Sequence, residues 1–106
     1  MNKAFGYVRC AVGDAPSMTA SIAYQLNMIS RASAVHGCNV QLVVVDITSG
    51  DATRVELDRL LERATLDGLD ALVVADATRL TRKTADLLML QARLGAQGVE
   101  IVCGVE

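Results

Sequence analysis

Apolar positions along the chain fall into two alternating patterns. Short continuous apolar runs predict β-strands, and they lie at 4–10, 40–46, 71–75 and 99–105. Stripes in which apolar residues recur every three or four positions predict helices, and they lie at 20–36, 55–64 and 82–96. The sequence therefore predicts four strands that alternate regularly with three helices.

The stripes also indicate which side chains face a core. The first helix is expected to end before Gly37 and to turn inward Ile22, Leu26, Ile29 and then Ala32 or Ser33. The third helix is expected to turn inward Leu87, Leu90 and Leu94. The run at 40–46 is apolar at nearly every position, which predicts a strand buried on both faces.

This alternation defines the fold class. Strand–helix–strand units with buried strands favour an α/β three-layer sandwich, with a mainly parallel sheet of four to five strands and helices on both faces. The topology is expected to be flavodoxin-like, in one domain spanning 1–106. Right-handed crossovers bring the carboxyl ends of the strands to one edge, where such sheets bind ligands.

Charged residues follow the strands at this edge. Arg9 lies near the end of the first strand and Asp46 ends the second, while Arg79 and Arg82 come after the third, and Arg54 lies in the first turn of the second helix. Arginine suits phosphate because its planar group donates two hydrogen bonds and stays charged. The alternative interpretation is a solvated rim, in which these arginines pair with the carboxylates of Asp46, Asp51 or Asp76.

The composition limits the partners that this chain binds. Hydrophobic residues make up 52% and aromatic residues only 3%, so the core is expected to be aliphatic. Tyr7 and Tyr24 are interpreted as packing residues whose hydroxyls reach water. Acidic residues outnumber basic ones, 12 to 10, whereas free-standing nucleic-acid binders usually carry a basic excess. DNA affinity of this domain alone is therefore expected to be weak or absent.

The cysteines and the N-terminus bear on the cellular compartment. Cys10, Cys38 and Cys103 form no C-x-x-C pair and are accompanied by one histidine, so neither a disulfide framework nor a zinc site is expected. Arg9 interrupts the first apolar run too early for a signal peptide. No apolar segment approaches the roughly 20 residues that span a bilayer. We expect a cytoplasmic protein with no membrane contact.

Four segments in order carry a family resemblance. "FGYVR" followed by "SIAYQL" resembles the start of serine recombinase catalytic domains of the resolvase/invertase type, with their Tyr-x-Arg-Val-Ser segment and Ser-Leu-x-x-Gln helix. "DITSGDATRVELDRLL" is similar to the family's Asp-x-x-Ser-Gly segment and leucine-rich helix. "ALVVADATRLTRKTADLL" resembles its strand and Asp-Arg-Leu-x-Arg segment, and "LGAQGVEIVC" its approach to the next strand.

This resemblance implies a resolvase-like topology, a reaction and a set of site residues. In the family a serine attacks a DNA phosphate and forms a phosphoserine link, and subunits of a tetramer then exchange strands without ATP or metal. Carried over by position, the phosphate-binding arginines are Arg9, Arg54, Arg79 and Arg82, and the supporting polar residues are Asp46, Ser49 and Gln25. The resemblance thus implies DNA and a homo-oligomer, dimer or tetramer, as partners, and no cofactor.

The chain departs from the family pattern at two reacting positions. Ala11 stands where the family has its nucleophilic serine, and Thr78 stands where it usually has aspartate. Two substitutes remain as alternatives: Cys10, which strand alternation points to the opposite face, and Ser17 in a lengthened loop. Thr78 and the altered loop favour natural divergence over an engineered alanine. Strand cleavage is therefore expected to be impaired.

Three functions remain open at this stage. The first is a recombinase catalytic domain with impaired cleavage. The second is a non-enzymatic dimerisation or regulatory module derived from a recombinase; residues 1–106 are expected to hold the catalytic domain without the family's long dimer helix and helix-turn-helix domain, as a fragment or as a stand-alone protein. The third, a small-molecule phosphate or nucleotide binder, lacks a glycine-rich G-x-G-x-x-G loop.

Overall fold

A parallel sheet forms the centre of the molecule. The computed structural model describes residues 2–48, 55–66, 68–81 and 83–104. Within these residues the sheet has four strands, all parallel, in the spatial order β2-β1-β3-β4. They are β1 (Asn2–Ala11), β2 (Cys38–Thr48), β3 (Ala71–Val74) and β4 (Glu100–Cys103). The predicted α/β class is confirmed.

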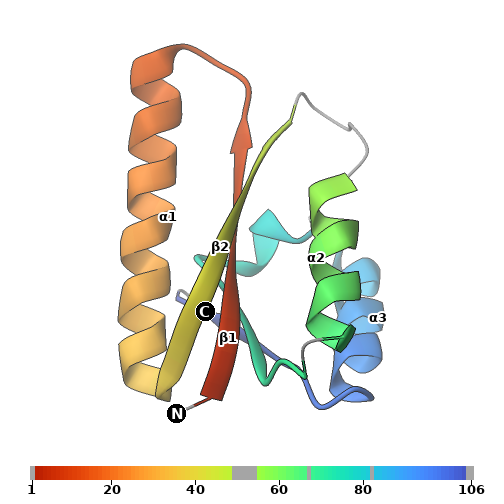
Figure 1. Ribbon diagram of the computed structural model, residues 1–106. Helices are drawn as coiled ribbons and strands as arrows, with labels where there is room; N and C mark the ends of the chain where they lie inside the picture. The colour runs from red at the N-terminus through yellow and green to blue at the C-terminus, as the bar shows by residue number, and fades with distance from the viewer. Residues whose placement is uncertain (1, 49–54, 67, 82, 105–106) are drawn as a thin grey trace.

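Helices cover both faces of this sheet. Figure 1 shows α1 on one face, and α2 and α3 together on the other. Their bounds are α1 (Ala15–His36), α2 (Val55–Leu66) and α3 (Thr84–Gly95), and a short 3₁₀ helix, η1 (Ala77–Arg79), follows β3. The expected three-layer sandwich is therefore confirmed, and η1 is an addition that the apolar pattern did not predict.

Aliphatic side chains fill the two interfaces between these layers. On the α1 side Val8 and Val73 of the sheet pack with Ile29 of the helix, and all three are at most 3% exposed. On the other side Leu72 and Leu94 are each 1% exposed, and Leu87 and Leu90 of α3 pack against this cluster. Burying each such side chain stabilises the fold by about 1.5–3 kcal/mol.

The strand β2 is less buried than its apolar run predicted. It lies at an edge of the sheet, with β1 as its neighbour. Leu42, Val45 and Ile47 are 38%, 40% and 48% exposed. The prediction of burial on both faces was wrong because a β-branched run indicates a strand but does not indicate which neighbours that strand acquires.

The first helix begins at Ala15, five residues before the expected start at residue 20. Asp14 precedes it in an extended conformation, and its carboxylate accepts a hydrogen bond of 2.8 Å from the Ser17 backbone N–H. Pro16 lies in the first turn, where its missing N–H removes no helical bond. Residues 15–19, which were expected to belong to a loop, therefore form the capped start of α1. At the other end Gly37 closes α1 with φ 65°, as expected.

Acidification is expected to weaken this cap. The Ser17 backbone N–H, and secondly the Ser17 hydroxyl, hold the pKa of Asp14 below its ordinary value of 3.8. Because the folded-state pKa is the lower one, the stabilisation is complete above the unfolded-state pKa and is lost as the pH falls through the folded-state pKa. Thermal unfolding midpoints across about pH 2–6 measure this loss. Asp14→Asn keeps a capping oxygen without the charge. If the midpoints of the variant and the natural chain fall in parallel on acidification, Asp14 is not the group responsible.

Candidate functional site

Arg9 lies near the carboxyl end of β1, where the winding of the sheet changes direction. The chain passes from β1 to β2 on one side, and β3 then pairs with the other side of β1. Open α/β sheets bind ligands at the carboxyl ends of strands around such a switch point. In the β1–β2 ladder Arg9 is opposite Asp46, and Ala11 is opposite Thr48.

A threonine on β2 holds the Arg9 side chain at this edge. The Arg9 Nε donates a hydrogen bond of 3.3 Å to Oγ1 of Thr48, which is only 7% exposed. Strand alternation places Arg9 and Ala11 on the same face as Tyr7, the face that α2 and α3 cover. The guanidinium group is therefore fixed beside the end of β2 and on the face to which Ala11 belongs.

Gln25 of α1 secures the backbone of Arg9. Its Nε2 donates to the Arg9 carbonyl at 2.8 Å and to Ser21 Oγ at 3.2 Å, and its Oε1 accepts from the Arg9 N–H at 3.1 Å. The ladder between β1 and β3 ends where Tyr7 is opposite Val74. Beyond that point the amide of Gln25, which is fully buried, bonds the Arg9 backbone as a neighbouring strand would.

Asp46 bonds to a tyrosine. Its Oδ2 accepts a hydrogen bond of 2.8 Å from the Tyr7 hydroxyl, with Asp46 6% and Tyr7 0% exposed. The expectation that the Tyr7 hydroxyl reaches water was therefore wrong. The contact links β1 to β2. Asp46 thus bonds to Tyr7, two residues before Arg9 in β1.

Arg79 lies in η1, directly after the third strand. Its Nε is 3.5 Å from Oδ2 of Asp76, with the two side chains 29% and 25% exposed. Thr78, the residue that stands in place of the family's aspartate, is exposed and donates from its backbone N–H to Asp76 Oδ1 at 3.0 Å. Since η1 contacts β1, Arg79 is at the same edge of the sheet as Arg9. One of the three carboxylates named for the rim interpretation, Asp76, is therefore paired with an arginine.

Three residues bear on the question of a nucleophile. Ala11 is exposed at the end of β1. Cys10 is 3% exposed, and its Sγ lies 3.9 Å from the Met18 carbonyl oxygen of α1, on the face opposite Ala11. The Ser17 hydroxyl donates to Asp14 Oδ2 at 3.0 Å within the helix cap. The Cys10 thiol is thus enclosed by packing, and the Ser17 hydroxyl belongs to a structural cap.

The remaining candidates are Arg54, Arg82 and Ser49, which lie outside the described residues. Of the six candidates that the structure describes, Arg9 and Arg79 lie at the carboxyl edge, and Asp46 and Gln25 brace the strand that carries Arg9. Thr78 lies beside Arg79, and Ala11 ends β1.

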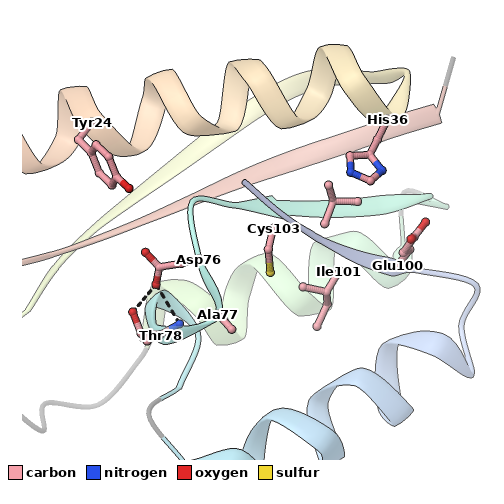
Figure 2. Close-up of a pocket in the computed structure, with 9 residues that line it drawn as sticks. Tyr24, His36, Asp76, Ala77, Thr78, Glu100, Ile101 and Cys103 are labelled. Atoms are coloured by element: carbon pink, nitrogen blue, oxygen red, sulfur yellow. Dashed lines mark hydrogen bonds between the residues drawn. The ribbon is translucent and has the colours of Figure 1, made fainter. Parts of the chain in front are cut away.

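A pocket of about 690 Å³ lies beside this edge, between α1 and β4 (Figure 2). Tyr24 and His36 of the helix line it on one side, and Glu100 and Cys103 of β4 line it on the other. Asp76, one of two carboxylates in the lining, comes from the segment just before η1. A lining with two carboxylates is a poor host for phosphate, although Asp76 and Thr78 at one end of the pocket lie next to Arg79.

The described part of the chain contains neither a metal-binding cluster nor a membrane-spanning helix. Across residues 2–48, 55–66, 68–81 and 83–104, no group of three or more His, Cys, Asp or Glu side chains is placed to hold a metal ion. In the same part of the chain, no helix has the length and apolar character needed to cross a membrane.

Sequence reasoning missed two members of this site. Thr48 lies two residues after Asp46, and strand alternation alone would have placed both on one face beside Arg9. Asp76 was named only as one possible partner, although its spacing of three residues from Arg79 favours a local pair.

The chain was compared with known proteins. Residues 4–106 match the family model described as "Resolvase, N terminal domain". Among curated proteins, no sequence matches the chain significantly. The solved N-terminal catalytic domain of TP901-1 integrase is similar, with a TM-score of 0.79 at 19% identity over 95% of this chain and 76% of that chain.

Two other solved structures have similar folds. A resolvase family site-specific recombinase from Streptococcus pneumoniae has a TM-score of 0.77 at 18% identity over 97% of this chain and 72% of that chain. The C-terminal catalytic domain of ISC1926 TnpA, an IS607-like serine recombinase, has a TM-score of 0.76 at 21% identity over 98% of this chain and 68% of that chain. These likenesses concern the fold, while the family model spans nearly the whole sequence. The chain therefore belongs to the resolvase N-terminal domain family.

Proposed function

We propose that this chain is a recombinase catalytic domain that binds a DNA phosphodiester at the carboxyl edge of its sheet and is impaired in strand cleavage. One observation carries the proposal. Arg9 lies two residues before Ala11 on the same face of β1, and Thr48 of β2 holds its guanidinium group in place. The positive charge of Arg9 therefore lies beside Ala11, the residue that stands at the family's nucleophile position. Arg79 adds a second guanidinium at the edge, and the proposal also includes Arg54 and Arg82.

The chemistry explains why binding is kept while cleavage is lost. A serine at position 11 would use its Oγ to attack phosphorus, and the bond from phosphorus to the departing deoxyribose oxygen would break. The developing negative charge would be stabilised by arginines, which need no chemical change to do so. Alanine has no oxygen with which to form the phosphoserine bond. Loss of a covalent nucleophile removes most of the rate enhancement of such a unit.

Removing either described arginine is expected to weaken DNA binding. Arg9→Gln and Arg79→Gln should each raise the dissociation constant for a 20-base-pair duplex of mixed sequence about three- to tenfold at low salt. Each should also reduce the slope of log K against log salt by about 0.9, because one fewer phosphate is neutralised. Fluorescence anisotropy over a salt series measures both quantities.

Arg93→Gln is the matched control. Arg93 is exposed in the last turn of α3, which leads into the start of β4 and so lies at the opposite edge of the sheet. The change removes the same charge far from the proposed site. Equal effects of all three substitutions would mean that binding follows net charge, and the proposed site would be wrong.

A non-enzymatic module that dimerises, or that pairs with an active recombinase, is the second candidate. The observation that favours it is on α3, where Leu88 and Met89 are 60% and 71% exposed. Exposed apolar side chains on adjacent positions of a helix are typical of association surfaces. Sedimentation with and without the duplex separates the two candidates: self-association without DNA affinity favours the module.

A further inference from the structure

The segment after β3 holds a carboxylate in a fixed place beside Arg79. Asp76 caps η1, and its Oδ1 accepts from both the backbone N–H and the hydroxyl of Thr78 (Figure 2). Its other oxygen, Oδ2, lies 3.5 Å from the Nε of Arg79. The Thr78 contacts thus fix Oδ1 and leave Oδ2 directed at the arginine.

The contact engages one side of the guanidinium group. The Nε atom of Arg79 is buried, and among the described residues it has no hydrogen-bond partner within the usual geometric limits, Asp76 being its nearby charge. The whole side chain is nevertheless 29% exposed, so its exposed surface belongs to other atoms. An arginine whose Nε faces a carboxylate keeps the pair of N–H groups on its two terminal nitrogens for a second, bidentate partner.

We propose that Asp76 is the positioning residue for Arg79, holding its Nε so that the terminal nitrogens face an oxyanion at the carboxyl edge of the sheet. The inference rests on the proposed function, because that oxyanion is a DNA phosphate. The inference also bears on Thr78, which stands where the family usually has aspartate. In this chain Asp76, two positions earlier, provides the carboxylate beside the arginine.

The competing interpretation is that Asp76 neutralises Arg79. A partly exposed ion pair between residues three apart contributes little by itself and reduces the positive charge that DNA meets. The two interpretations predict opposite signs when the carboxylate is neutralised. A neutralising residue opposes anion binding, so its removal strengthens binding, whereas a positioning residue supports binding, so its removal weakens it.

Asp76→Asn is the test, because asparagine keeps the size of the side chain and an oxygen that caps Thr78. We expect this variant to bind the 20-base-pair duplex about threefold to tenfold more weakly, although it carries one negative charge fewer. Asp86→Asn is the control, since Asp86 is an exposed acidic residue in the first turn of α3, near the same edge. It should bind slightly more tightly, as expected from net charge.

A double-mutant cycle and a spectroscopic readout separate positioning from loss of structure. In the Arg79→Gln background Asp76→Asn should have no further effect on binding, because its target is absent. The ¹⁵N-resolved Hε resonance of Arg79 should exchange slowly with solvent in the natural chain and rapidly in Asp76→Asn. Adding Thr78→Asp to Asp76→Asn should restore part of the binding by returning a carboxylate to the segment.

Each outcome decides the inference. Tighter or unchanged binding by Asp76→Asn, with Arg79→Gln still weakened, overturns the positioning role and leaves the proposed function standing. Binding that is unaffected by Arg79→Gln overturns both. Weaker binding that persists unchanged in the Arg79→Gln background means that Asp76 acts through another group, and this also overturns the inference.

Discussion

Replacing Gln25 by leucine is expected to lower the free energy of unfolding by up to about 2–6 kcal/mol, because a part-buried backbone donor and a part-buried backbone acceptor each lose a partner at about 1–3 kcal/mol. Both groups belong to Arg9, and both bond to the Gln25 amide, which is fully buried. Leucine has nearly the volume of glutamine, so the loss reflects hydrogen bonding rather than a cavity.

Denaturant titration followed by circular dichroism measures this change. Leu26→Gln is the matched control, since Leu26 is the next residue of α1 and is 40% exposed. Its free energy of unfolding should change by about 0.5 kcal/mol or less, as is usual for surface substitutions. A loss for Gln25→Leu no larger than that of the control would show that Arg9 finds other partners.

The same pair of residues shows where the sequence pattern misleads. The stripe of α1 was expected to bury Leu26, whereas the structure buries Gln25 and leaves Leu26 half-exposed. Hydrophobicity ranks leucine above glutamine at any core position. The burial of Gln25 follows from the end of β3 at Val74, which leaves the Arg9 backbone without a strand neighbour. That cause lies about fifty residues away in the sequence and has no local signal.

Most of the framework could be predicted because its signals are local. Each strand contains a short apolar run, and Gly37 follows the first helix at the position where a left-handed residue closes it. Strand order is not local in this sense. The apolar run of β2 is as continuous as that of β3, yet β2 is an edge strand and β3 is buried throughout.

The candidate site could be predicted in position but not in pairing. Arg9 and Arg79 lie at the carboxyl edge because Arg9 is near the end of one strand and Arg79 follows another, which sequence order establishes. The pairing of Arg9 with Thr48, and of Arg79 with Asp76, depends on side-chain distances that only coordinates provide. Motif spacing suggested the phosphate-binding candidates, and of the three carboxylates named with them only Asp76 has a spacing that favours a local pair with Arg79.

Replacing Ala11 by serine is expected to create a covalent DNA adduct that the natural chain does not form. The new hydroxyl would lie on the same face of β1 as Arg9, whose guanidinium is already held by Thr48. Attack on phosphorus would transfer the DNA strand to Ser Oγ and release a deoxyribose hydroxyl. The measurement is the retention of internally ³²P-labelled DNA on the protein in a denaturing gel, using duplexes of random sequence. The expected change is from no detectable adduct to a measurable fraction.

Val12→Ser is the control that isolates geometry from chemistry. Val12 directly follows β1 at a bend and is 62% exposed, and its N–H bonds the Thr48 carbonyl at 2.9 Å. Its side chain therefore lies outside the strand face that carries Arg9 and Ala11. A serine there offers the same hydroxyl at nearly the same place in the sequence and should give no adduct. Adding Arg9→Gln to Ala11→Ser should abolish the adduct, because the charge forming on the phosphate would lose its partner. Equal adduct from serine at either position, or adduct from the chain with Ala11, would contradict a reaction that is limited by one missing hydroxyl on one face of β1.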